Sequence, residues 1–440
     1  MKDLSVRVYT NENAGKIRKI NGCNLSPPIH GEKTGGTNIR KEFAALNMPY
    51  ARMHDCPLDN PGCRLVDVPM IFANFHDDPD DPRNYYFTQT DDYFKNCIAC
   101  GTMPYYRLGV SIDHSMNKYF TRPPEDVDKW IDICSHIIRH YNEGWGGGFR
   151  FGIKYWEIWN EAENFGSCWY GAYAEYIRFY AKTAMGLKKR FPKLMIGGPA
   201  HSGFNEHVEP FIKYCAKHKV PIDFFSFHGY ARDPFDPAIT DAIFAVRKML
   251  DGAGYKKTEI HINEWHWFPA DWGKLQGNTP QNRNYKKRIF TMFKNNESAA
   301  CLCGILSRWQ DMPLDMGCYY TATSGAYGLF QTSLPTKAYY GMKAFGEIVN
   351  YPNRIKAESS DKLAIPLAGT DQTGNTAVLV SLFKTGAAKL SVKFDKLLPK
   401  SVKVRVVDQT RELEEVSVQV KGAVLSLELP SSSSVVLITF

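Results

Sequence analysis

The stretch YWEIWNE at residues 155–161 is a run of aromatic and branched residues that ends in the polar pair Asn160-Glu161. A second stretch, EIHINEW at residues 259–265, has the same design and also contains Asn-Glu near its end. Both stretches are short and rich in residues that favour strands, and a longer segment of helical period follows each of them. We therefore interpret both as buried strands of repeated βα units, with polar residues at their carboxyl ends.

The same alternation of strand and helix recurs along most of the chain, and it predicts eight units. The predicted strands are residues 17–25, 50–54, 103–109, 155–161, 195–199, 223–230, 259–265 and 304–310. The predicted helices are residues 38–46, 91–100, 126–140, 173–190, 208–218, 241–250, 281–293 and 338–348. Parallel neighbours need crossover helices, and right-handed crossovers close at eight, so we expect a (β/α)8 barrel. The alternative is an open sheet, but NGCNLSPP at residues 21–28 lacks the glycine-rich phosphate loop of that fold.

Beyond about residue 352 the pattern changes to short alternating strands without helices, as in SVKVRVV at residues 401–407. This alternation predicts an antiparallel β module, and residues 4–9 alternate in the same way. We therefore predict an α/β protein with a catalytic (β/α)8 TIM barrel over residues 15–350. Residues 1–14 and 351–440 would form an accessory antiparallel β-sandwich, so that the first strand ties the two ends of the chain together.

Composition excludes several classes of partner. The 440 residues carry 54 Lys and Arg against 46 Asp and Glu, a formal net charge of +8. The densest basic runs, residues 188–190 and 286–288, fall in predicted helices and are typical of solvated faces, so we expect no nucleic-acid partner. No stretch approaches the roughly 18 apolar residues of a membrane span. Aromatic residues make up 13% of the chain, and a carbohydrate site would use such rings to pack against sugars.

The cysteines indicate neither a disulfide framework nor a metal site. There are eleven, an odd number, in segments that read as strand and helix interiors, so we expect mostly free thiols. Cys97 and Cys100 form a C-x-x-C pair, but no second pair follows at ligand spacing, and we predict no metal and no cofactor. The residues after Met1 lack the apolar run of a signal peptide. That fits a cytoplasmic protein if Met1 is the natural start, and a periplasmic or secreted one if a leader precedes it.

Two strand ends carry the residues that suggest chemistry. In a (β/α)8 barrel the active site lies at the carboxyl ends of the strands. Glu161 and Glu264 close the fourth and seventh strands, 103 residues apart, which corresponds to three units of about 34 residues. These strands face each other across the barrel mouth, so both carboxyl groups can act on one glycosidic bond. A single Asn-Glu would more simply cap the next helix, but the pair at this spacing favours a glycosidase.

The acid of such a pair must hold a proton near neutral pH. We expect the neighbouring carboxylate and the aromatic residues Trp159 and Trp169 to raise the pKa of Glu161. Glu157 lies within the fourth strand and Glu163 in the loop after it, and both rank below Glu161 as candidate acids.

At this point the sequence resembles glycoside hydrolase family 39 of clan A, and its β-xylosidases in particular. WNE at residues 159–161 resembles the family's acid/base motif, and EW at residues 264–265 resembles its nucleophile motif. The resemblance implies that Glu161 is the general acid/base and Glu264 the nucleophile. The substrate-binding residues that it implies are Arg52, His54, Asn160, His228, Tyr230, Trp265 and Trp309.

The resemblance also implies roles for three of these residues. Asn160 would bind the sugar's 2-hydroxyl, Tyr230 would orient the nucleophile, and Trp309 on the eighth strand would form the floor of the subsite. Two departures stand beside the motifs: AEN at residues 162–164 replaces Pro-Asn, and HDC at residues 54–56 replaces His-Gly. These changes alter the rim of the site and leave the two glutamates.

The sequence thus predicts a retaining, β-xylosidase-like glycoside hydrolase, exo-acting on oligosaccharides from polysaccharide degradation. An inverting glycosidase and a non-catalytic carbohydrate-binding barrel protein remain alternatives. A metal-dependent hydrolase would carry His-x-His after the first strand, where Asn24 and Ser26 stand instead. The oligomeric state stays open.

Overall fold

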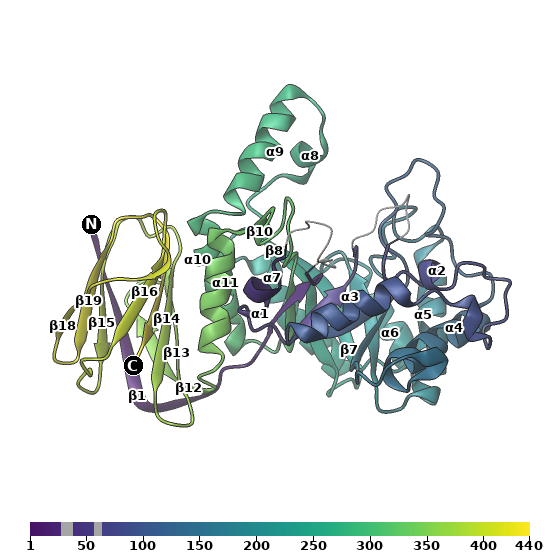
Figure 1. Cartoon of the computed structure of the whole chain (residues 1–440), viewed down its shortest axis with the longest axis horizontal. Coiled ribbons are helices and arrows are strands. Elements are labelled where there is room, and N and C mark those ends of the chain that lie inside the picture. The colour runs from purple at the N-terminus through teal and green to yellow at the C-terminus, as the bar shows by residue number, and fades with distance from the viewer. Residues whose placement is uncertain (28–37, 57–63) are drawn as a thin grey trace.

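The computed structural model describes residues 1–27, 38–56 and 64–440, and it confirms the closed barrel of eight parallel strands (Figure 1). The ring closes where the first barrel strand pairs with the last. The barrel strands are β2 (Asn21–Asn24), β3 (Tyr50–Met53), β4 (Met103–Leu108), β5 (Tyr155–Ile158), β6 (Met195–His201), β7 (Phe224–Ala231), β8 (Glu259–Trp267) and β9 (Met316–Tyr319).

Amphipathic helices cover the outside of the barrel. In α4 (Val127–Asn142) the side chain of Asp126 caps the first turn, and Trp130 and Ile137, two turns apart, lie on the buried face. The other helices around the barrel are α1 (Arg40–Ala44), α2 (Val68–Ile71), α3 (Thr88–Ala99), α5 (Tyr173–Arg190), α6 (Val208–His218), α7 (Pro237–Gly252), α10 (Asn296–Arg308) and α11 (Lys337–Ile348). None of the helices in the described ranges is long and apolar enough to cross a membrane.

The predicted eighth strand, residues 304–310, is wrong. These residues belong to α10 and to the 3-10 turn Trp309–Asp311 that follows it, whereas the eighth barrel strand is β9. Residues 298–307 are buried on every side because α10 lies between the barrel and the C-terminal sheet (Figure 1). A helix that is buried all round has no polar stripe, so a short apolar stretch of it reads like a buried strand.

The predicted helix at residues 281–293 lies outside the barrel wall. It is α9 (Pro280–Met292), and together with the short α8 (Trp272–Gln276) it forms a hairpin that projects from the barrel (Figure 1). Its only fully buried residue is Ile289, since the helix has few neighbours. The hairpin is an insertion between β8 and α10, which explains why eight units were counted although one strand was misplaced.

The two ends of the chain form one ten-stranded, mostly antiparallel sheet with a core of its own. β1 (Lys2–Lys16) pairs with β12 (Asn353–Ser359) and runs parallel to β15 (Ala388–Phe394), so the first strand joins the C-terminal module as its alternation predicted. The proposed boundaries at residues 14 and 351 remain a prediction. The other strands are β12 (Asn353–Ser359), β13 (Ala364–Thr370), β14 (Thr376–Leu382), β15 (Ala388–Phe394), β16 (Lys403–Val407), β17 (Glu412–Glu415), β18 (Gln419–Lys421), β19 (Val424–Leu429) and β20 (Ser434–Thr439).

The barrel interior is filled in layers that place the polar residues at one end. A cluster that includes Tyr105, Tyr155 and Phe224 plugs the amino-terminal end of the strands. Above it lies a buried polar layer centred on Arg52 and Glu157, which are joined at 2.7 Å. The strand ends above this layer are therefore free to form a pocket. The ten cysteines in the described ranges are free and buried, and Cys63 lies outside those ranges.

Candidate active site

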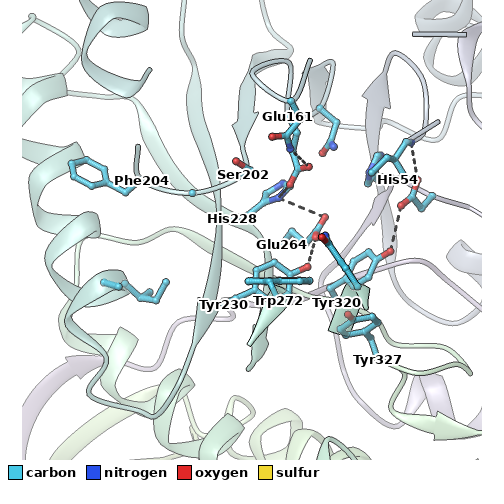
Figure 2. Close-up of a pocket in the computed structure, with 18 of the residues that line it drawn as sticks. His54, Glu161, Ser202, Phe204, His228, Tyr230, Glu264, Trp272, Tyr320 and Tyr327 are labelled. Carbon is cyan, nitrogen blue, oxygen red and sulfur yellow. Dashed lines mark hydrogen bonds and ion pairs between the residues drawn. The ribbon is translucent and has the colours of Figure 1, made fainter. Parts of the chain in front are cut away.

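A pocket of about 680 Å³ opens at the carboxyl ends of the barrel strands (Figure 2). Six of the nine predicted site residues line it: His54, Asn160, Glu161, His228, Tyr230 and Glu264. They come from β3, β5, β7 and β8 or from the residues that directly follow these strands. Residues predicted at four separate strand ends therefore meet at one pocket in the structure.

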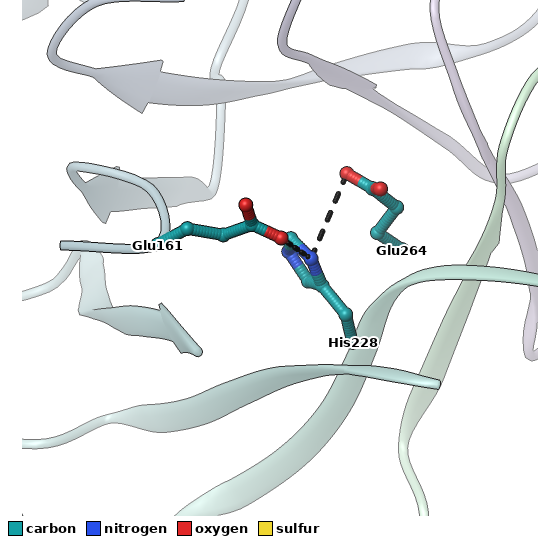
Figure 3. A group of neighbouring side chains, drawn as sticks. All are labelled: Glu161, His228 and Glu264. Atoms are coloured by element: carbon teal, nitrogen blue, oxygen red, sulfur yellow. Dashed lines mark hydrogen bonds and ion pairs between the residues drawn. The ribbon is translucent and has the colours of Figure 1, made fainter. Parts of the chain in front are cut away.

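Glu161, His228 and Glu264 form the centre of the pocket (Figure 3). His228 Nδ1 lies 2.7 Å from Glu161 Oε1 and 3.8 Å from Glu264 Oε2. One side-chain atom from each of the three residues lies within 4.8 Å of the other two. The two carboxyl groups thus approach each other closely enough for both to contact a single glycosidic bond.

The backbone after β5 directs Glu161 into the pocket. Trp159 and Glu161 have φ angles of 71° and 45°, in the left-handed region that non-glycine residues adopt at a cost of about 1 kcal/mol or more. The Glu161 N–H donates to the carbonyl of Ala200 at 2.9 Å, and the Trp159 indole donates to the carbonyl of Cys168 at 2.7 Å. Gly109 lies against the Trp159 ring, where a Cβ atom would approach it to 3.1 Å. Neighbouring strands therefore hold the unusual turn.

Glu264 is held by two side chains from other strands. The Tyr230 hydroxyl donates to Glu264 Oε1, and Arg52 Nη1 approaches Glu264 Oε2 at 3.5 Å. The Glu264 side chain is 10% exposed, so most of its surface is taken up by these neighbours. The remaining surface faces the pocket.

Arg52 connects Glu264 with Asn160, the residue before Glu161. It is fully buried and donates to Glu157 at 2.7 Å, to Asn160 Oδ1 at 2.6 Å and to Asn24 Oδ1 at 3.2 Å. Since Asn160 accepts through Oδ1, its amide nitrogen is left to face the pocket. This placement is compatible with the predicted contact between Asn160 and a sugar hydroxyl.

The pKa values of the two glutamates differ from the expected order. Burial raises the pKa of Glu161, but the charge and hydrogen bond of His228, together with Asn164, bring it below the ordinary glutamate value. Burial raises the pKa of Glu264, and the charge of Glu161 raises it further, against the opposing effects of His228 and Arg52. The net pKa of Glu161 is therefore lowered, opposite to the expected direction, because His228 outweighs burial. The Trp159 and Trp169 rings both pack against Phe179.

The rival acids lie outside the pocket lining. Glu157 is fully buried, and besides Arg52 it accepts hydrogen bonds from Asn263 at 2.6 Å and Ser226 at 2.8 Å. Glu163 accepts from the backbone N–H of Ser202 at 2.6 Å and holds the loop after β6. Both carboxylates therefore support the site from outside.

The two predicted tryptophans lie beneath the pocket. Trp265 and Trp309 are 0% and 2% exposed, and neither lines the pocket. Their rings pack edge to face, with centroids 4.9 Å apart. Trp309 follows α10 and lies against β9, where a Cβ atom on Gly317 would approach its ring to 2.6 Å. Its predicted place on the eighth strand is wrong for the reason given above.

Several residues of the pocket wall were not predicted from the sequence. Tyr320 and Tyr327 line the pocket after the true eighth strand, and the Tyr320 hydroxyl donates to Asp55 at 3.4 Å. Phe204, which is 41% exposed and was also missed, lies at the rim (Figure 2). Trp272, which is 47% exposed, lies there too, in the loop after the proposed nucleophile, where the sequence indicated that it would narrow the cleft. The signal for Tyr320 was its position directly after a strand, and it was hidden because that strand was misplaced.

Comparison with known proteins is consistent with this geometry. The model of the family described as Glycosyl hydrolases family 39 matches residues 7–286. The chain is 32% identical over 161 residues to a β-xylosidase from Geobacillus stearothermophilus, covering 33% of this chain and 31% of that protein. It is 26% identical over 356 residues to a β-xylosidase from Caldicellulosiruptor saccharolyticus, covering 78% of this chain and 68% of that protein.

Among solved structures, the fold is similar to that of a glucosidase from Croceicoccus marinus, with a TM-score of 0.82. The match covers 100% of this chain and 99% of that chain at 19% sequence identity. At this identity the likeness concerns the fold alone. Both the barrel and the terminal sheet take part in it, because the match spans the whole chain.

Proposed function

The chain belongs to glycosyl hydrolases family 39, and on that premise we propose that it is a retaining glycoside hydrolase with Glu264 as nucleophile and Glu161 as general acid/base. The observation that carries the proposal is the approach of the two side chains, which place carboxylate oxygens within 4.8 Å of each other. Retaining enzymes hold their carboxyl groups about 5 to 5.5 Å apart, whereas inverting enzymes need about 6.5 to 9.5 Å. The separation supports double displacement over inversion.

The reaction has two steps. In the first, a Glu264 carboxylate oxygen bonds to the anomeric carbon while the bond to the leaving oxygen breaks, and Glu161 gives its proton to that oxygen. In the second, water attacks the anomeric carbon of the glycosyl-enzyme, Glu161 takes the proton of that water, and Glu264 leaves as a carboxylate. Tyr230 and Arg52 orient Glu264 throughout, since they contact its two oxygens.

The first step needs a protonated Glu161 and an ionised Glu264. In the ligand-free site, His228 lowers the pKa of Glu161 while burial raises that of Glu264, which is the reverse of the order that this step needs. His228 Nδ1 lies 2.7 Å and 3.8 Å from the two carboxyl groups, so the charge of His228 acts on both pKa values.

The shape of the pocket supports action on a terminal sugar. Aromatic rings from separate segments enclose the space above the carboxyl pair: Phe204, Trp272, Tyr320 and Tyr327. Such walls pack on the C–H faces of one or two sugar units, whereas the middle of a polysaccharide needs an open cleft. We propose a β-xyloside-like substrate because two relatives over parts of this chain are β-xylosidases.

The proposal is tested with a panel of aryl glycosides, including xyloside, arabinoside, galactoside and glucoside. Glu264→Ala should abolish hydrolysis, while Glu161→Ala should retain turnover of substrates with good leaving groups in the first step. The control is Glu206→Ala, since the Glu206 side chain is 84% exposed, and it should match the wild type. Full activity of either active-site variant would overturn the proposal.

Azide rescue decides which glutamate has which role. With Glu161→Ala, azide should replace water in the second step and give a glycosyl azide of retained configuration. With Glu264→Ala, azide should give the inverted product in a single displacement. The opposite pair of outcomes would exchange the two roles, as the order of the pKa values alone would suggest.

The same three atoms at the centre of the pocket are also close enough to hold a metal ion. The assays are therefore run with and without EDTA. Double displacement between two glutamates predicts the same rate in both cases, and loss of activity on chelation would contradict it.

A further inference from the structure

The ammonium group of Lys294 is enclosed by a single turn of the chain, residues 325–328. Lys294 follows α9, and its Nζ donates to the carbonyl oxygens of Gly325 at 2.7 Å, Ala326 at 3.3 Å and Gly328 at 3.0 Å. An ammonium group has three donors, so each one has an acceptor here. Among the described residues, Lys294 forms no ion pair with a carboxylate. The group is therefore held by the backbone alone.

The turn that Lys294 holds carries Tyr327, a residue of the pocket wall. The Tyr327 ring packs against three other rings. Its centroid lies 5.8 Å from that of Tyr320, 5.6 Å from that of His266 and 5.5 Å from that of Phe293. Burial raises the pKa of Tyr327, and the negative charge of Glu264 raises it further. The phenol thus lies in the field of the proposed nucleophile, beside Tyr320 (Figure 2).

Besides Lys294, the turn is held by ring contacts of Tyr327 and by a hydrogen bond from the Thr321 N–H to the Tyr327 carbonyl at 3.3 Å, neither of which involves the carbonyls of Gly325, Ala326 and Gly328. Residues 325–328 belong to neither a helix nor a strand, and the Gly328 N–H donates to Gly325 at a long 3.2 Å. Gly325 has a φ of 133°, and a Cβ atom on Gly328 would lie 2.1 Å from the carbonyl oxygen of Thr323, so both positions depend on glycine. Glycines leave the free chain flexible. An ammonium that binds three of the four carbonyls removes that freedom.

Burial lowers the pKa of Lys294 to about 8, so the side chain keeps its charge and all three donors at neutral pH. A neutral isostere such as methionine would fill the same space without binding any carbonyl. The carbonyls of Gly325 and Gly328 would then lose their side-chain donor, and the turn would be held less tightly, by the remaining backbone hydrogen bonds and the Tyr327 ring contacts alone.

We propose that Lys294 is a positioning residue for substrate binding: its ammonium closes the turn 325–328 and thereby fixes the Tyr327 ring against Tyr320 beside Glu264. The consequence for catalysis rests on the proposed hydrolase function. The effect of Lys294 on the turn does not depend on that function.

The test compares Lys294→Met with Lys287→Met, which removes an exposed lysine of the same hairpin. Lys294→Met should lower kcat/KM about tenfold or more, mainly through KM, because a displacement of about 1 Å in a binding wall can cost up to about 100-fold. Lys287→Met should match the wild type. Tyr327→Ala should also lower kcat/KM, and adding Lys294→Met to it should change little further, since the lysine acts through Tyr327.

Hydrogen exchange measured by mass spectrometry makes the test independent of turnover. The N–H groups of Thr321 and Leu329, which pair with Tyr327 and Thr321 across the turn, should exchange faster in Lys294→Met and not in Lys287→Met. Unchanged exchange, or additive losses of kcat/KM in the double variant, would overturn the proposal. A wild type that cleaves no glycoside would instead refute the proposed function, while the exchange data still decide the role of Lys294.

Discussion

Replacing Arg52 by methionine tests the polar layer beneath the pocket. The Arg52 and Glu157 side chains are both 0% exposed, so the variant leaves a buried carboxylate without its cation. Breaking a buried ion pair from one side costs about 3 to 5 kcal/mol. Asn263 and Ser226 still donate to Glu157 at 2.6 Å and 2.8 Å, which places the expected loss near the lower limit. We therefore expect a free energy of unfolding reduced by about 3 kcal/mol.

The assay is guanidinium unfolding followed by tryptophan fluorescence, with a double-mutant cycle. Glu157→Gln keeps a hydrogen-bonding side chain without the charge, so adding it to Arg52→Met should recover much of the loss. The matched control is Arg354→Met, which breaks a pair with Asp311, 67% exposed, and should cost about 1 kcal/mol or less. A loss below about 1 kcal/mol for Arg52→Met, or no recovery in the double variant, would refute the reasoning.

The remaining predictions concern the pocket itself. Tyr230→Phe removes a hydrogen bond to the charged Glu264, worth about 1.5 to 3 kcal/mol, so kcat/KM should fall about 10- to 100-fold, and unchanged kinetics would exclude the orienting role. His228 lowers the pKa of both carboxyl groups, so His228→Asn should raise the pKa of Glu161 and of Glu264 and move both limbs of the pH–rate profile to higher pH. A shift to lower pH would contradict that sign. Trp272→Ala should raise KM for a disaccharide more than for an aryl glycoside, because this exposed ring lies at the rim of the pocket.

The positions of the two glutamates could be predicted because strand ends leave a local signal. Residues 155–161 and 259–265 each show a buried apolar run that stops at Asn-Glu, and the (β/α)8 repeat places such ends on one rim. His228 and Tyr230, which lie on β7, were instead implied by the resemblance to family 39. No knowledge of distances was needed, since the chain order alone puts the fourth and seventh strands across the barrel from each other.

The eighth strand could not be predicted from the sequence. The residues of the pocket wall that follow this strand were therefore not predicted either. Burial of α10 from both sides left residues 298–307 without a polar face, so part of this apolar stretch was read as a buried strand. Trp309 was therefore placed in the pocket, whereas Tyr320 occupies the wall beside Asp55.

The sequence by itself determined the barrel, the strand at residues 4–9 that joins the terminal sheet, and the positions of the two glutamates at strand ends. It could do so because periodicity and strand ends are properties of short segments. Only the tertiary structure decided which carboxyl group is more acidic, since that depends on His228 lying 2.7 Å from Glu161 and 3.8 Å from Glu264. It also decided that Lys294 reaches the turn at residues 325–328, some thirty positions away. Electrostatic fields and hydrogen bonds act through space, and neighbours in space are fixed only when the barrel closes.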